Sequence, residues 1–270
     1  MGMVFGVRGG AVCLVWVCRM IEIKSVSSIP QGMRDEYLDS LTKAQDLYLE
    51  ELVREGAVWL MGDMGYAVVS GDSLVEFFVP GEFREKLIFL FDTLVDFCRI
   101  KQVLCKSFDS DLLFVSLSRQ VHMSTVGLLF REIADSSFHL VEGQCMRPAN
   151  EADIDTIVAF DDGFFHDRAE IEHYFAEGNL YAFDCAGSVR GCGIVTPVIA
   201  GRNYMDVGVL VAPEFRNQGC GAYIVSFLKS AMLEQGYNPI CSCSNENRAS
   251  AKALQRAGFV CGHRVLKFVF

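Results

Sequence analysis

The sequence has no C-x-x-C pair although it contains 11 cysteines, and no two of its 5 histidines lie one helical turn apart. Zinc sites need a tetrahedral set of ligands at suitable spacings. His166 and His173, about two turns apart on a helix, cannot supply a pair of ligands. The sequence therefore predicts no metal site. The odd number of cysteines, many within apolar stretches such as CLVWVC, indicates free, mostly buried thiols in a reducing cytoplasm.

Positive charge is also scarce. The chain has 24 Lys and Arg against 34 Asp and Glu, a net charge of −10. Without a basic face to offset phosphate repulsion, non-specific binding to nucleic acid is excluded. Hydrophobic residues make up 51% of the 270 positions and charged residues 21%. This composition is typical of a globular protein with a substantial core and room for two domains.

No apolar run is long enough to span a membrane. The run AVCLVWV, between Arg8 and Arg19, is too short, and no small-x-small cleavage site or myristoylation signal accompanies it. We interpret residues 1–19 as a dispensable extension upstream of the true start, with a weak export signal as the alternative. We expect a cytoplasmic protein without a membrane partner.

From residue 20 onward the pattern alternates between strands and helices. One long helix is predicted from Pro30 to Gly56. Three strands (AVWLMG, YAVVSG and SLVEFFVP), a helix over residues 82–99, and the strands QVLCKS and STVGLLF follow. Residues 134–143 are expected to form a linker. The second half repeats the plan, which predicts an α/β fold in which a mixed sheet is flanked by helices.

One turn occurs twice. Residues 79–91 read VPGEFREKLIFLF and residues 211–225 read VAPEFRNQGCGAYIV, so Glu-Phe-Arg joins a strand to a helix in both. The elements around the two copies occur in similar order at a shift of 132 residues, Val79 to Val211. We interpret this as duplication of a whole domain.

Only the second copy has the glycines of a phosphate-binding turn. The first turn of a helix has unpaired N–H groups and a partial positive charge. Gly219 and Gly221 leave these amides open, so that a pyrophosphate could bind directly on them. Arg216 either adds positive charge to this anion-binding position or stabilises the conformation of the turn. A Walker loop is excluded because Gly-Lys-Ser/Thr is missing, and a dinucleotide fingerprint because Ile224 stands where a third Gly is needed.

The segment DVGVLVAPEFRNQGCGAYIV resembles motif A of the GNAT superfamily of acyl-CoA-dependent N-acetyltransferases. Further segments resemble the family in order: MRPANEADIDTI, the hairpin of residues 179–198, PICSCSNENRAS and KALQRAGF. The likeness covers residues 144–270 and is similar to bacterial members that carry a degenerate GNAT-like domain ahead of the active one. It implies tandem GNAT-like domains: a degenerate one at residues 20–133, the linker at 134–143, and a catalytic one at 144–270. In the degenerate copy, Leu87 and Phe89 replace the glycines and are expected to cover the helix amides.

The resemblance also implies acetyl-CoA as co-substrate, held in a gap between two splayed strands, MDVGVLV and ICSCS. The residues that it assigns to the coenzyme are Val209, Leu210, Val211, Arg216, Asn217, Gln218, Gly219, Cys220, Gly221, Ala222 and Asn247. Asn247 could equally be a helix N-cap. A thiol at Cys220 could sense oxidation if the helix lowered its pKa, or could be a small filler.

The implied reaction is direct attack of an amine on the thioester, which requires a base and an acid. Asp206 matches an acidic position that serves as base in some members, or is a solvated strand-end carboxylate. The family's usual acid is a Tyr, and here Leu254 stands in that position. The chain is therefore interpreted as an N-acetyltransferase acting on a primary amine of a small molecule or peptide; an acyl-CoA-binding sensor with little turnover is the alternative.

The acceptor is expected near the loop that contains Asp161, Asp162, Phe164, Phe165 and His166, which either binds a cationic amine or simply caps a helix over core aromatics. The chain ends one strand after Gly258-Phe259, so the family's usual last strand is missing. Because an uncovered sheet edge promotes aggregation, the first domain or a partner chain in a homodimer is expected to cover it.

Overall fold

The computed structural model describes residues 7–8, 11–12, 21–135 and 144–270. Most of the proposed extension, residues 1–19, and most of the proposed linker, residues 134–143, therefore lie outside the described residues. Two short paired strands, β1 (Val7–Arg8) and β2 (Ala11–Val12), are described within the extension.

A single sheet of 12 strands runs through the rest of the chain in the order β3-β4-β5-β6-β7-β14-β8-β13-β12-β11-β10-β9. The strands of the first half are β3 (Ile23–Val26), β4 (Ala57–Met61), β5 (Tyr66–Ser70), β6 (Ser73–Phe78), β7 (Gln102–Lys106) and β8 (His122–Ile133). Those of the second half are β9 (Gln144–Pro148), β10 (Leu180–Cys185), β11 (Ser188–Pro197), β12 (Tyr204–Val211), β13 (Asn238–Ser244) and β14 (Phe259–Val269).

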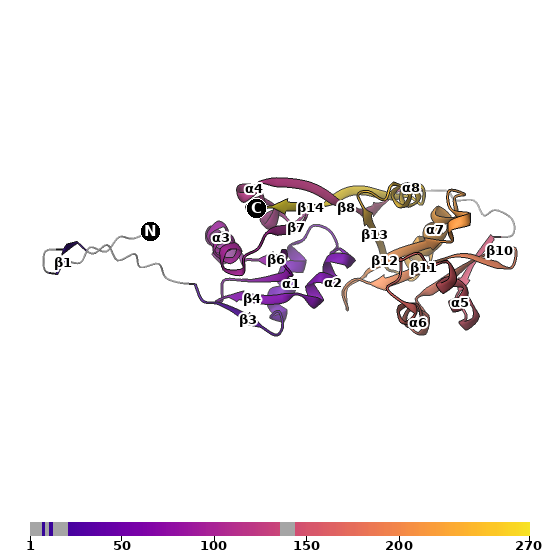
Figure 1. The fold of residues 1–270 in the computed structure, drawn as a ribbon, viewed down its shortest axis with the longest axis horizontal. Helices are drawn as coiled ribbons and strands as arrows, with labels where there is room; N and C mark the ends of the chain where they lie inside the picture. The colour runs from indigo at the N-terminus through magenta and orange to yellow at the C-terminus, as the bar shows by residue number, and fades with distance from the viewer. Residues whose placement is uncertain (1–6, 9–10, 13–20, 136–143) are drawn as a thin grey trace.

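The two halves exchange their last strands. β8 lies between β13 and β14, whereas β14 lies between β7 and β8. β8 pairs antiparallel with β13 from Gly127 to Phe130, and β14 pairs antiparallel with β7 from Val265 to Val269. Figure 1 shows these two long strands running together between the halves, with the C-terminus beside the first half. The edge expected to be uncovered at the end of the second half is thus covered by the first half.

Helices flank the sheet. They are α1 (Gln31–Ser40), α2 (Leu47–Glu55), α3 (Leu87–Cys98) and α4 (Ser110–Arg119) in the first half, and α5 (Glu151–Phe160), α6 (Arg168–Ala176), α7 (Cys220–Glu234) and α8 (Arg248–Arg256) in the second. Within the described ranges, no helix combines the length and the apolar character that a bilayer crossing requires.

The prediction of one long helix between Pro30 and Gly56 is wrong. Leu41 adopts an extended conformation and ends α1, and Asp46 starts α2 by accepting the N–H of Leu49. A short side chain that caps its own backbone favours a new helix start over continuation. The intervening loop carries Gln45 to the buried carboxylate of Glu76, at 3.3 Å. Residues that the sequence pattern placed inside one helix thus form a loop, and this loop makes a tertiary contact with Glu76.

The sheet's shared strand β8 separates two cores. Leu129 packs in a core of the first half with residues such as Tyr66 and Val68, and its neighbour Phe130 packs in the core of the second half with Ile224 and Phe259. Both β8 side chains are fully buried, at 0% exposure. Successive residues of a strand point to opposite faces, so one strand closes two cores.

Candidate functional site

Strands β12 and β13 pair over only three residues and then separate. The parallel register joins Tyr204 to Asn238, Met205 to Pro239 and Asp206 to Ile240. Beyond this point β13 pairs with β8 instead, starting with Cys241 opposite Phe130, while β12 remains paired with β11. The unpaired edge of β12 therefore faces a wedge-shaped gap, where its backbone groups are available to a ligand.

The gap opens into a cleft of ≈ 880 Å³. The predicted residues that line it are Asp206, Val209, Leu210, Val211, Arg216, Asn217, Gly219, Cys220, Gly221, Ala222 and Asn247. Gln218 does not line it, because its side chain turns back to donate to the carbonyl of Glu214 at 3.0 Å. The structure thus brings the predicted site residues together around one cleft, except for the side chain of Gln218.

The loop before α7 presents backbone amides to this cleft. Asn217 and Gly219 have positive φ angles of 62° and 87°, in the left-handed region that favours glycine and tolerates asparagine. The N–H of Tyr223 makes a helical bond to the carbonyl of Gly219 at 3.1 Å. The amides before it belong to the first turn, which a helix cannot satisfy internally. They form an anion-binding position at the positive end of α7.

Packing around Gly221 leaves room for a Cβ. A Cβ built on it would lie 3.6 Å from the Cβ of Ala253 and 3.7 Å from Cγ2 of Val211, an ordinary contact distance. It stands where α7, α8 and β12 meet. Gly219, by contrast, would direct a Cβ into open space, so only its backbone conformation requires glycine.

Arg216 locks the turn. Its Nε donates to the carbonyl of Val211 at 2.9 Å, and its Nη1 lies 2.8 Å from Oδ2 of Asp162. This hydrogen bond to Arg216 lowers the pKa of the Asp162 carboxyl. Of the two roles predicted for Arg216, these contacts favour the structural one, because its charge is already paired.

Two other residues of the cleft have structural duties. Asn247 is the N-cap of α8, accepting the N–H of Ser250 at 3.0 Å. Cys220 is buried, and burial raises the pKa of its thiol. A redox sensor would need a lowered pKa, so the structure favours a small filler at Cys220.

Asp206 lies at the point where the strands separate. Its Oδ1 is buried and has no hydrogen-bond partner. Burial raises the pKa of this carboxyl well above its ordinary value, the charge of Asp46 raises it further, and Arg131 opposes the shift. An unpartnered buried carboxyl that lines a cleft is typical of functional sites. Leu254, also on the cleft wall, is 2% exposed and cannot donate a proton.

The loop between α5 and α6 caps itself, as one of its two interpretations predicted, and it also lines the cleft. Asp161 accepts the N–H groups of Phe164 and Phe165, at 2.9 and 3.4 Å. Phe165 is buried in the core beneath α5 and α6, whereas Phe164 is 40% exposed and lines the cleft. The loop thus caps itself and still contributes an aromatic ring to the site. His166 donates its N–H to Glu170 at 2.7 Å.

Several residues that line the cleft were not predicted, and three of them bear on its function. Lys252 and Arg256 are exposed on α8 and add positive charge to the cleft wall. Their spacing of one helical turn was the available signal. Leu47, the first residue of α2, reaches the cleft from the first half of the chain. No local pattern in the sequence points to that contact.

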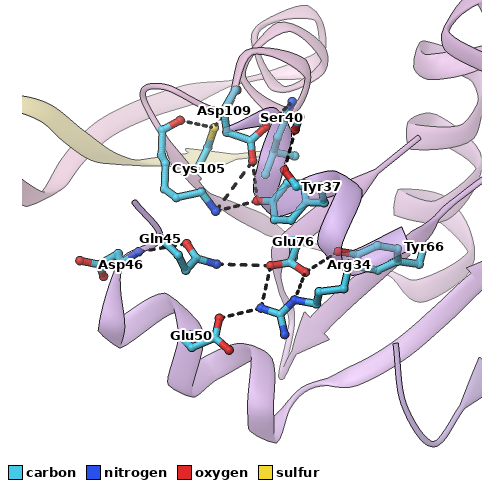
Figure 2. Close-up of polar contacts among 12 residues, drawn as sticks. Arg34, Tyr37, Ser40, Gln45, Asp46, Glu50, Tyr66, Glu76, Cys105 and Asp109 are labelled. Carbon is cyan, nitrogen blue, oxygen red and sulfur yellow. Dashed lines mark hydrogen bonds and ion pairs between the residues drawn. The ribbon is translucent and has the colours of Figure 1, made fainter. Parts of the chain in front are cut away.

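The equivalent gap in the first half is closed. Strands β6 and β7 pair in parallel only at Ser73–Gln102 and Leu74–Val103 and then diverge. Beyond the divergence lies Glu76, which is 0% exposed. Figure 2 shows its carboxylate bound by Arg34, Tyr66 and Gln45.

A second buried group lies beside it. The ammonium of Lys106 donates to the hydroxyl of Tyr37 at 2.7 Å, which donates to Asp109 at the same distance. The buried polar side chains of this half thus form a network of hydrogen bonds and ion pairs around Glu76 and Asp109 (Figure 2), in contrast to the open wedge of the second half.

The helix start also differs between the halves. A 3₁₀ helix over Gly81–Lys86 runs directly into α3, and the N–H of Leu87 donates to the carbonyl of Arg84. The left-handed residues that orient the amides before α7 are not reproduced over residues 81–87. Leu87 is buried in the core, but Phe89 is 48% exposed. The first copy of the turn therefore differs from the second mainly because the 3₁₀ turn engages a backbone amide at the start of α3. Coverage of the amides by Phe89 contributes less.

No group of three or more His, Cys, Asp or Glu side chains suited to a metal occurs among the described residues.

Comparison with protein-family models finds acetyltransferase (GNAT) matches in both halves of the chain. The sequence model described as "Acetyltransferase (GNAT) domain" matches residues 26–133, and the one described as "Acetyltransferase (GNAT) family" matches residues 135–259. No curated protein sequence matches the chain.

Solved structures share the fold over nearly the whole length. A GNAT-family acetyltransferase from Colwellia psychrerythraea superposes with a TM-score of 0.82 at 20% identity, covering 92% of this chain and 99% of its own. A GCN5-related N-acetyltransferase from Sphaerobacter thermophilus gives 0.58 at 15% identity, with 91% and 94% coverage. A tandem GNAT protein from the clavulanic acid biosynthesis pathway gives 0.55 at 11% identity, with 92% and 98% coverage.

Proposed function

This chain belongs to the acetyltransferase (GNAT) family, with two of its domains in tandem, and we propose that it transfers an acetyl group from acetyl-CoA to a primary amine of a small molecule or peptide. The observation that carries the proposal is the wedge between β12 and β13, which ends at the amides of α7 in a cleft of ≈ 880 Å³. A cleft of this size suits a large, elongated co-substrate.

The cleft offers a different partner to each part of acetyl-CoA. The free backbone edge of Val209, Leu210 and Val211 suits the amides of pantetheine, which would add to β12 like a strand. The amides from Asn217 to Ala222 suit the pyrophosphate. We assign Lys252 and Arg256 to the phosphates as well, since their charges lie at the same cleft.

The thioester would then lie near Asp206, at the narrow end of the wedge. We propose that Asp206 takes the proton that the amine loses as its nitrogen attacks the carbonyl carbon. The carbon–sulfur bond breaks, and water protonates the thiolate, because Leu254 replaces the family's usual tyrosine. The raised pKa of Asp206 favours its action as a proton acceptor.

The first half is proposed to bind no coenzyme. Its helix amides are used by the 3₁₀ turn before α3, and its wedge holds the buried side chains around Glu76. We retain residues 20–133 as the degenerate domain, 134–143 as the linker and 144–270 as the catalytic domain. The nine described cysteines are free thiols, which suits a reducing cytoplasm.

One observation favours the alternative of an acyl-CoA sensor. Leu254 gives the cleft no acid in the family's usual position, so binding without rapid turnover would be consistent with the site. A sensor and an enzyme differ in thiol release when amines are supplied.

Isothermal titration with acetyl-CoA, followed by thiol-release assays with a panel of amines, tests these proposals together. We expect one binding site per chain and amine-dependent release of the CoA thiol. Two sites would contradict the degenerate first half. Binding without release would favour the sensor, and the absence of binding would overturn both functions.

A further inference from the structure

Two apolar side chains meet above a glycine of β12, close to Asp206. A Cβ built on Gly208 would lie 2.7 Å from Cγ1 of Ile194 and 3.2 Å from Cζ of Phe164. Ile194 is the register partner of Gly208 on β11, and both side chains line the cleft. Because a larger residue at this position would collide with them, Gly208 allows the ring of Phe164 to approach the strand closely.

Asp206 lies on the same face of the strand. It precedes Gly208 by two residues, so its side chain and the ring of Phe164 are on one side of β12. Leu47 joins them from the first half of the chain, since it lines the cleft and packs against the core cluster that contains Ile240, the register partner of Asp206 on β13. Three apolar side chains, from α2, β11 and the loop between α5 and α6, thus lie in the part of the cleft that contains the Asp206 carboxyl.

The loop between α5 and α6 holds the ring of Phe164 in place. The N–H of Phe164 donates to Asp161 at 2.9 Å, and its ring packs edge-to-face against Phe165 with the centroids 4.8 Å apart. Phe165 is buried, and Asp162 connects the loop to Arg216 at 2.8 Å. Phe164 nevertheless remains 40% exposed. A fixed aromatic ring is therefore available to a ligand in the cleft.

Asp206 is the one carboxyl of the cleft wall that has no paired cation, among the residues that the structure describes. The other charged side chains of the wall are Asp162, Arg216, Lys252 and Arg256. Asp162 and Arg216 pair with each other, and Lys252 and Arg256 lie on α8. A second charge or a hydroxyl on the acceptor, placed against the three apolar side chains, would lose its water without gaining a partner.

We propose that the acceptor is an apolar monoamine, in which the reacting amine is attached to an alkyl chain or an aromatic ring. Phe164, Ile194 and Leu47 bind the apolar group, and Asp206 faces the nitrogen. Ligand sites of this kind combine apolar and aromatic walls with a few polar groups that fix the orientation. The inference rests on the proposed acetyltransferase activity and narrows the class of its acceptor.

The test compares three amines of equal size that differ only at the far end. Initial rates of thiol release from acetyl-CoA are measured with hexylamine, 5-amino-1-pentanol and 1,5-diaminopentane, which end in a methyl, a hydroxyl and an ammonium group. We expect kcat/KM for hexylamine to exceed that for each polar analogue about tenfold. 2-Phenylethylamine, whose ring can pack on Phe164, should be at least as good an acceptor as hexylamine.

Substitution of Phe164 tests the part played by its ring. Phe164→Ala should lower kcat/KM for hexylamine about tenfold and that for 5-amino-1-pentanol much less, so that the ratio between the two amines falls toward one. Phe164→Leu keeps an apolar side chain and should preserve most of the ratio. Tyr48→Ala is the matched control and should leave the ratio unchanged, because Tyr48 follows Leu47 and is 56% exposed but does not line the cleft.

Several outcomes would overturn the inference. Equal or higher kcat/KM for either polar analogue would refute it while leaving the acetyltransferase function intact. So would a Phe164→Ala variant that keeps the ratio, because an equal loss with every amine indicates only a general change of structure. If acetyl-CoA binds but no amine releases thiol, the proposed function fails first, and this inference with it.

Discussion

At the scale of single residues, the coenzyme site depends on the backbone of Gly219. Its φ of 87° is unfavourable for any residue with a Cβ, at a cost of about 1–2 kcal/mol. We expect Gly219→Ala to relax the turn and misdirect the amides before α7. The dissociation constant of acetyl-CoA, measured by isothermal titration, should rise about tenfold.

Gly236 provides the control for this change. It has a similar φ of 83°, and a Cβ on it would also point into open space. It follows the C-terminal end of α7, away from the amides. Gly236→Ala should therefore cost similar stability and leave the affinity for acetyl-CoA unchanged. Equal weakening by both substitutions would mean that general strain, not the anion-binding turn, controls binding.

The raised pKa of Asp206 predicts how the free energy of unfolding changes with pH. Because its pKa is raised in the folded protein, the folded state binds the proton more tightly than the unfolded state does. The stability contribution is therefore complete below the unfolded value, near 4, and is lost as pH rises through the folded value. Asn has no such dependence. Free energies of unfolding from urea titrations should show Asp206→Asn gaining on the natural chain as the pH rises above about 4.

The same substitution should remove the proton acceptor. We expect kcat to fall by about 10²–10⁴-fold, the range for loss of a general base, with acetyl-CoA still bound. A stability difference that does not change with pH would contradict the raised pKa. Unchanged kcat would remove Asp206 from the mechanism without affecting that stability argument.

At the scale of elements, α8 brings a basic face to an acidic protein. Lys252 and Arg256 line the cleft, whereas Arg248 at the start of the helix does not. Exposed ion pairs contribute about 0.2–1 kcal/mol each. Lys252→Ala and Arg256→Ala should each raise the dissociation constant of acetyl-CoA by up to about fivefold at low salt, less at high salt. Arg248→Ala is the control, and an equal effect from it would indicate only a change in net charge.

The sequence made the strands, the glycine turn and most helices predictable, because these follow from local spacing. It did not predict the break between α1 and α2, because the loop there makes a contact with a residue distant in sequence, the hydrogen bond from Gln45 to Glu76. Leu47 was missed for the same reason: its contact with the cleft depends on how two distant segments pack. The exchange of β8 and β14 was foreseen only as cover for an edge, because strand pairing leaves no local signature.

At the scale of the whole molecule, the exchanged strands make the two halves one structure. β8 pairs with β13 of the second half and β14 pairs with β7 of the first, so each half completes the sheet of the other. The cleft is shared in the same way, because Leu47 of the first half lines it. The second half therefore depends on the first for a strand, whether or not the first half binds a coenzyme.

This coupling predicts how the chain unfolds. Phe130 lies on β8 but packs, fully buried, in the core of the second half. Phe130→Ala should cost about 3–5 kcal/mol. Trp59 lies in the first half, packed against its core, and reports on that half alone once Trp16, the other tryptophan, is replaced by Phe. We expect the loss to appear in full in Trp59 fluorescence during urea unfolding, as a single transition. Phe114→Ala, at a side chain 56% exposed on α4, controls for loss of the ring and should change little. If Trp59 reports an unchanged midpoint while acetyl-CoA binding is lost at lower urea, the halves unfold separately and the shared sheet does not couple them.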